Sequence, residues 1–133
     1  MKSCIKKLLG EKGASAVEFA IILPVLIMLV FGIIQFGLAF NKYIALTHAA
    51  REGARLAAVG IYEEDPIYFE QAVRDSAPTV EIETITVENP EDIRIGNPVA
   101  VTVKGKIFFI DIPMAGRWGP IELTGKATMR REK

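Results

Sequence analysis

An uninterrupted apolar run near the N-terminus constrains this chain more than any other feature. Residues 20–40 are 21 residues without a formal charge, and Gln35 is the only strongly polar one among them. As a helix they would span about 31 Å at roughly 1.5 Å per residue, close to the hydrocarbon thickness of a bilayer. Soluble helices rarely stay apolar on every side over such a length, and a membrane helix tolerates a proline such as Pro24. The run therefore predicts a membrane-spanning helix.

The charges that flank this run predict its orientation. Two acids, Glu11 and Glu18, and four lysines precede it, and the lysines are Lys2, Lys6, Lys7 and Lys12. Because cytoplasmic flanks are enriched in basic residues, we expect the N-terminus in the cytoplasm and residues 41–133 across the membrane. An ordinary cleaved secretory signal fits poorly, since its apolar region is usually only about 7–15 residues long. A plain single-pass anchor remains an alternative.

The composition argues against several classes of function. Lys plus Arg and Asp plus Glu both number 16, so the formal net charge is zero, which disfavours nucleic-acid binding through phosphate neutralisation. The single cysteine, Cys4, excludes an intramolecular disulfide, and the single histidine, His48, has no second histidine or cysteine that would suggest a metal site. The sequence contains no glycine-rich phosphate loop, and nothing in it brings a serine to His48. We therefore expect no enzyme, no cofactor, no metal and no small-molecule substrate.

Glu18 stands at the edge of the apolar run, where a carboxylate is costly and usually has a partner. If the chain were cut after Gly13, Glu18 would be the fifth residue of the remaining chain. The new amine of Ala14 would then lie four residues away, about 6 Å along a helix. The alternative is that Glu18 is a solvated flank of the membrane helix.

The order of these features is typical of one kind of processing signal. A short basic leader, a glycine, a glutamate at the fifth position after it and an apolar helix together resemble the class III signal of type IV pilins. The resemblance implies that a prepilin peptidase cuts the bond between Gly13 and Ala14 and removes residues 1–13. It also implies that Glu18 pairs with the N-terminal ammonium of a neighbouring subunit, which offsets desolvation of both groups and fixes the axial register between helices.

Three stretches together narrow the resemblance to one family. The stretches "GASAVEFAIILPVLIMLVFGIIQFG", "ALTHAAREGARLAA" and, near the end, "LTGKATMRRE" resemble the TadE-like family of pseudopilins of the tight-adherence (Flp pilus) system. This implies a minor pilin-like subunit in the bacterial inner membrane, with its C-terminal domain outside the cytoplasm and a role in pilus assembly and adhesion. The implied partners are the prepilin peptidase, other pilin-like subunits and the pilus assembly platform. The alternative is an unprocessed, membrane-anchored extracytoplasmic binding module.

The residues after the apolar run continue as a good helix former up to residue 59. Small residues recur there at four-residue spacing, so that they form one ridge that allows close approach of another helix: Ala45, Ala49, Gly53 and Ala57. The ridge could contact the chain's own C-terminal domain or a partner. We thus expect a leader at 1–13, a long helix at 14–59 with its membrane part at 20–40, and an extracytoplasmic domain at 60–133.

The C-terminal domain shows one helix signal and three strand signals. Asp65 is a natural N-cap with Pro66 at the first helical position, and residues 79–88, 99–109 and 121–130 alternate as strands do. A change of parity in the first strand predicts a bulge near Thr84. In the third strand one parity is apolar: Ile121, Leu123, Ala127 and Met129. We predict an α+β fold, with a three-stranded antiparallel meander packed on a helix and on the alanine-rich end of the long helix.

The stretch 107–118 is the most apolar loop-bounded part of this domain. Phe108, Ile110 and Trp118 are candidates for a partner contact. The alternative, core and strand end, accounts for most of these residues.

Overall fold

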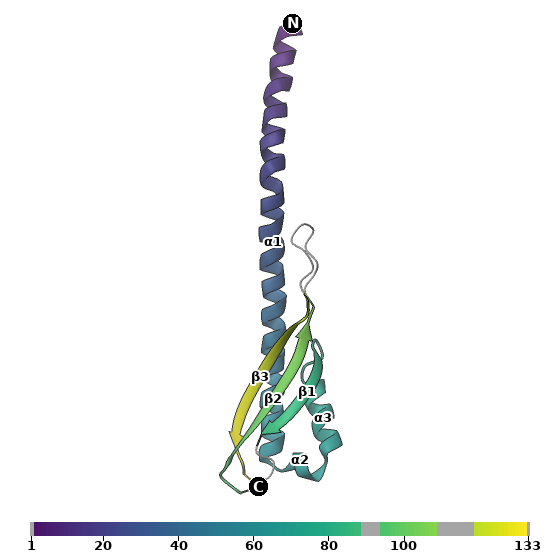
Figure 1. Cartoon of the computed structure of the whole chain (residues 1–133), viewed down its shortest axis with the longest axis vertical. Helices are drawn as coiled ribbons and strands as arrows, with labels where there is room; N and C mark the ends of the chain where they lie inside the picture. Colours follow the sequence, from purple (N-terminus) through teal and green to yellow (C-terminus); the bar gives the residue numbers. More distant parts are fainter. Residues whose placement is uncertain (1, 89–93, 109–118, 133) are drawn as a thin grey trace.

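The protein is a long helix with a small α+β domain packed on one side of its C-terminal half, as Figure 1 shows. A computed structural model describes residues 2–88, 94–108 and 119–132, with side chains from Gly13 onward. Helix α1 runs over Lys2–Ala58, followed by α2 (Ile61–Glu64), α3 (Pro66–Asp75), β1 (Glu81–Glu88), β2 (Pro98–Ile107) and β3 (Ile121–Arg130). The predicted α+β class and the three-stranded antiparallel sheet are confirmed.

Helix α1 has two halves that differ in their surroundings. Every residue of 13–31 is exposed, whereas most residues of 49–58 are buried against the domain. Gly60, at φ 88°, ends the helical stretch in the left-handed region that glycine adopts without strain. The helix also extends through residues 2–13 of the predicted leader, 1–13.

The region after Gly60 forms two helices. The short α2 follows directly and was not anticipated from the sequence. Asp65 then caps α3, because its carboxylate accepts a hydrogen bond from the backbone N–H of Tyr68 at 2.9 Å, and Pro66 occupies the first turn. The predicted helix at this cap is confirmed, and its apolar residues Phe69 and Val73 are buried.

The sheet is an antiparallel meander in the order β1–β2–β3. The β1–β2 register shifts between Ile82 and Thr84, which confirms the predicted bulge. In the central strand β2, alternate residues from Val99 to Ile107 are buried against α1 and α3. In β3 only the middle of the apolar parity is covered, and its end residues Ile121 and Met129 are exposed.

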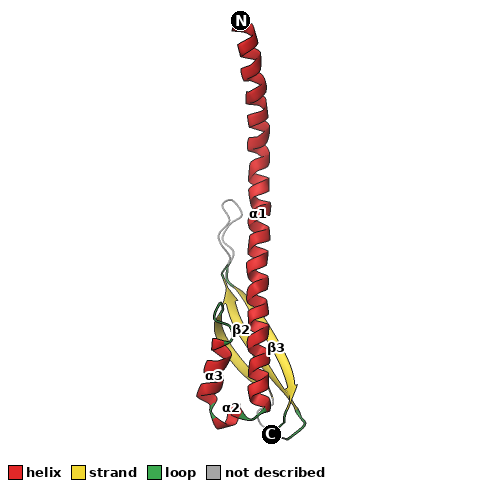
Figure 2. Cartoon of the chain, turned by 180° about the vertical axis from the view of Figure 1, so that it is seen from behind, coloured by secondary structure: helices red, strands yellow, loops and turns green. Residues whose placement is uncertain are grey.

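The core lies between the sheet, α3 and the C-terminal half of α1, as Figure 2 shows from the opposite side. Its fully buried side chains include Leu46 of α1, Val73 of α3, and Val101 and Val103 of β2. The strands approach the α1 backbone closely at one point. A Cβ atom on Gly125 would lie only 2.5 Å from the carbonyl oxygen of Leu46. The sheet can therefore pack this tightly on α1 only because position 125 lacks a side chain.

Candidate functional site

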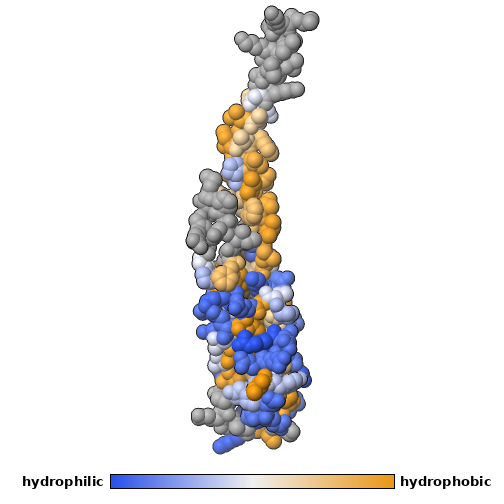
Figure 3. Space-filling model, turned by 90° about the vertical axis from the view of Figure 1, so that its right-hand side faces the viewer, coloured by the Kyte–Doolittle hydropathy of each residue, from blue (hydrophilic) through white to orange (hydrophobic). Residues whose placement is uncertain are grey.

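The N-terminal half of α1 is the largest apolar surface in the described part of the chain. By length and composition, α1 is also the one helix among the described residues that could cross a membrane, and its most apolar window is not buried at all. Figure 3 shows this half as a continuous hydrophobic column above a largely hydrophilic domain. A column of this kind needs an apolar environment, either lipid or other helices.

Glu18 and the predicted cleavage site lie on this exposed half. Gly13, Ala14 and Glu18 are all exposed residues of α1. A side chain at Gly13 would meet nothing within 4 Å. Within the described residues no side chain forms a hydrogen bond or ion pair with Glu18. The carboxylate therefore projects outward from a single chain, where a group from another molecule could reach it.

Gln35 is the one polar residue of the apolar run, and it is buried to 7% exposure. No buried side-chain nitrogen or oxygen of a described residue lacks a hydrogen-bond partner, so its amide is satisfied. Gly32 and Ala39, on the same side of α1, are half-buried. Protein therefore packs against α1 as far up as Gln35, within the last turns of the run. The sequence shows the polar residue but gives no sign of this cover.

The small-residue ridge is occupied by the chain's own domain. Ala49, Gly53 and Ala57 are buried and Ala45 is half-buried. A Cβ atom on Gly53 would lie 3.0 Å from a methyl group of Val101 and 3.1 Å from one of Val73. Of the two contacts left open by the sequence, the structure shows the internal one. The ridge is thus filled within one chain.

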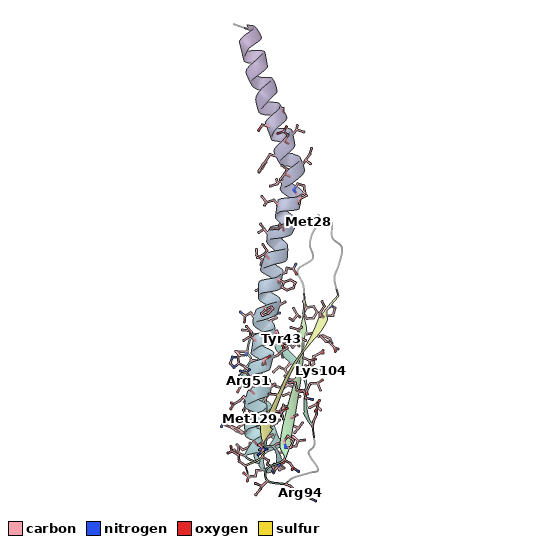
Figure 4. The ribbon with its side chains drawn as sticks, turned by 90° about the vertical axis from the view of Figure 1, so that its left-hand side faces the viewer. Met28, Tyr43, Arg51, Arg94, Lys104 and Met129 are labelled. Atoms are coloured by element: carbon pink, nitrogen blue, oxygen red, sulfur yellow. The ribbon has the colours of Figure 1, made fainter. Side chains whose placement is uncertain are left out.

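The opposite face of α1 in this region is polar and open. His48 and Arg51 are exposed, and Figure 4 shows Arg51 projecting from the helix. Together with Glu52, Arg55, Ser76 and Met129 they line a hollow of about 350 Å³. Hydrogen bonding from Arg55 at 2.5 Å and 3.1 Å lowers the pKa of the Glu52 carboxyl. The described residues contain no group of three or more His, Cys, Asp or Glu side chains that could hold a metal ion.

A second hollow, of about 320 Å³, lies between α3 and the edge strand β1, and Tyr62, Phe69 and Arg74 are among its lining residues. The Arg74 guanidinium donates to the backbone carbonyl of Ile82 at 2.5 Å and to the Glu70 carboxylate at 2.7 Å. Arg74 thereby covers part of an otherwise unpaired strand edge. Its contacts are structural, and they leave no arranged set of reactive groups.

Of the three candidate partner residues, the structure describes Phe108. Phe108 follows β2 directly and is 66% exposed. Ile110 and Trp118 lie outside the described residues.

An ion pair that the sequence did not reveal ties the C-terminal end of the chain to α2. Arg131 is buried, and its guanidinium donates to the Glu63 carboxylate at 2.7 Å. Next to it, the backbone N–H of Glu132 donates to the carbonyl of Ala58 at 2.9 Å. These contacts fix the end of β3 to the end of α1. No local pattern could reveal a pair between residues so far apart in the chain.

Comparison with family models gives a match that covers most of α1. Residues 13–55 match the model described as TadE-like protein. This segment of the chain is TadE-like. The TadE-like segment begins at Gly13 and covers the exposed half of α1 together with most of the half that the domain packs against. The comparisons with curated proteins and with solved structures found no match. The family match, with the single apolar helix, suggests a membrane protein associated with the Tad pilus, held by a single-pass anchor.

Proposed function

We propose that this chain is a minor pilin-like subunit of a tight-adherence type pilus. It would be inserted in the bacterial inner membrane with its N-terminus in the cytoplasm and its domain outside. The division of α1 carries this proposal. Its apolar half is exposed on all sides over residues 13–31, which lie inside the TadE-like segment, whereas most of residues 49–58 are buried against the chain's own domain. The apolar half is therefore the part of α1 that is free for helix-to-helix contacts with other subunits inside the membrane.

Glu18 is the residue to which this proposal gives a specific role. Its carboxylate projects from α1, and a mature N-terminus at Ala14 would present a positive charge one helical turn away. Two such helices side by side, offset along their axes, place the carboxylate of one beside the amine of the other. Inside the membrane boundary such a pairing is strongly favoured over two separate charges. Processing would create the amine, so cleavage and assembly would be linked.

The domain fits a structural role in assembly and adhesion better than catalysis. Each of its two described hollows has an ion pair in its lining, Arg55 with Glu52 in one and Arg74 with Glu70 in the other. Its sheet presents a polar outer face with cross-strand pairs such as Lys126 with Glu88 at 2.7 Å. Such a surface suits contact with water or with other extracytoplasmic proteins. The proposed partners are the prepilin peptidase, other pilin-like subunits and the assembly platform.

The test is the intact mass and N-terminal sequence of the membrane-extracted protein, produced with its cognate prepilin peptidase. We expect Ala14 as the first residue. Gly13→Leu should abolish cleavage, while Gly32→Leu should leave it unchanged. The two substitutions are matched, since an added Cβ atom meets nothing within 4 Å at either position. An intact leader on the wild-type chain would favour the unprocessed membrane-anchored binding module instead.

A further inference from the structure

Large apolar side chains remain exposed where the domain meets the apolar half of α1. Four of them come from three elements or their ends: Phe40 and Tyr43 of α1, Phe108 after β2, and Ile121 at the start of β3. Phe108 is 66% exposed and Ile121 is 43% exposed. We call these four side chains the apolar collar. The rings of Phe40 and Tyr43 meet edge to face, with centroids 6.4 Å apart.

Contacts between β2 and α1 show that the collar lies at one level of the long axis. Val101 lies against Gly53, and Gly105 lies against Leu46, so four residues of β2 run past seven residues of α1. At the same inclination, the three further residues to Phe108 reach about the level of residue 41 on α1.

Ile121 follows from the sheet register, because it pairs with Ile107, the residue before Phe108. The tip of the sheet therefore lies at about the same level along α1 as Phe40 and Tyr43. In Figure 1 this end of the sheet points toward the N-terminus of α1.

The same level is the end of the apolar run. Residues 20–40 carry no charge, and the first charged side chain after them is Lys42. If the run spans a bilayer, the boundary between hydrocarbon and headgroups lies near residues 40–43. Gln35, inside the run, is itself only 7% exposed. The domain is thus too close to the run to stand clear of the membrane.

We propose that the apolar collar rests in the interfacial layer of the bilayer, so that lipid covers Phe108 and Ile121 and holds the domain against the membrane. The inference rests on the proposed membrane insertion of α1. We favour lipid over a protein partner for two reasons. The collar adjoins the apolar half of α1, and it lies at the depth of the bilayer interface, where aromatic side chains concentrate.

Other exposed apolar side chains of the domain lie at its opposite end and provide a matched control. Ile95 is 74% exposed and precedes the turn at Gly96, whose backbone pairs with Arg131 near the end of the chain. Ile95 therefore resembles Phe108 in exposure but lies far from the apolar run. If hydropathy alone decided contact with lipid, positions 95 and 108 would behave alike. The proposed depth predicts lipid contact at 108 and not at 95.

The experiment places one nitroxide label at a time on the full chain, with Cys4 replaced by serine and one copy per nanodisc of phosphatidylethanolamine and phosphatidylglycerol. Labels are carried by Phe108→Cys, Ile95→Cys and Leu26→Cys. Collision rates are measured with oxygen, which concentrates in lipid, and with a water-soluble nickel chelate. We expect the oxygen-to-nickel ratio at position 108 to exceed that at 95 several-fold and to approach that at 26.

Each other outcome overturns the proposal in a recognisable way. A ratio at 108 equal to that at 95, with position 26 in lipid, would mean that the domain stands clear of the membrane although α1 spans it. Protection of position 108 from both reagents would mean that protein, not lipid, covers it. Access of the nickel chelate to position 26 would remove the membrane span itself, and the inference with it.

Discussion

Gly125→Ala offers the sharpest test of how the domain is attached to α1. A Cβ atom at this position would lie 2.5 Å from the carbonyl oxygen of Leu46, 2.6 Å from its carbonyl carbon and 2.9 Å from the backbone nitrogen of Thr47. Ordinary contact begins at 3.4 Å, so the sheet would have to move away from the helix by about 0.9 Å. The atoms in the way belong to the helix backbone, and no rotation of a side chain can relieve the contact.

The size of the effect follows from what such a displacement does to the core. A gap of about 0.5–1 Å removes a quarter to a half of each dispersion contact across the interface. Overpacking typically costs about 1–3 kcal/mol, and the rigid backbone neighbour places this change at the upper end, about 3 kcal/mol. That is roughly a hundredfold in the ratio of folded to unfolded domain. For a domain without disulfides it is a large part of the usual stability of about 5–15 kcal/mol.

The assay is urea unfolding of the full chain in nanodiscs, followed by brief proteolysis and measurement of the protected domain. With a typical urea dependence of about 1–3 kcal/mol per molar, the midpoint should fall by about 1–3 M. Gly119→Ala is the matched control, because an added Cβ atom there meets nothing within 4 Å, and it should stay close to the wild-type midpoint. Equal midpoints for the two variants would show that the backbone of α1 does not approach position 125 as described.

Three further predictions concern charged groups. Glu18→Ala should insert normally, yet recover fewer pilus components than wild type in a pull-down at matched membrane levels, because the carboxylate acts between subunits. Equal recovery would mean that Glu18 is only a solvated residue at the flank of the membrane helix. Glu63→Gln should lower the free energy of unfolding by about 1–3 kcal/mol in the urea assay, since it weakens the bond to the buried Arg131 guanidinium; an unchanged midpoint would contradict this. Hydrogen bonding from Lys126 lowers the pKa of the Glu88 carboxyl, so its stabilising effect is present above the unfolded-state pKa of about 4.3 and is lost as the pH falls through the folded-state pKa. The midpoint difference between wild type and Glu88→Gln should therefore shrink on acidification, and a pH-independent difference would refute the pairing.

Several elements follow from the sequence because they depend on local chemistry. A helix formed by the 21 uncharged residues 20–40 has no charged face to turn toward water. The exposed apolar column could therefore be predicted. The adjacent residues Asp65 and Pro66 predict the start of α3, and in the structure Asp65 is its N-cap. The change of parity along β1 required an extra residue in one strand, and the bulge lies where the change occurs.

Other features depend on which distant segment covers a given face, and only the tertiary structure decided them. The ridge at Gly53 could have served another subunit, but Val101 and Val73 fill it. Gln35 read as an isolated polar residue in an apolar run, yet it is buried and satisfied. Periodicity identifies a face that can be buried. Which segment covers that face depends on packing across the whole fold, here on the inclined sheet that contacts α1 at Gly125. That same inclination brings the tip of the sheet to the end of the apolar run, a level that no local pattern in the strands encodes.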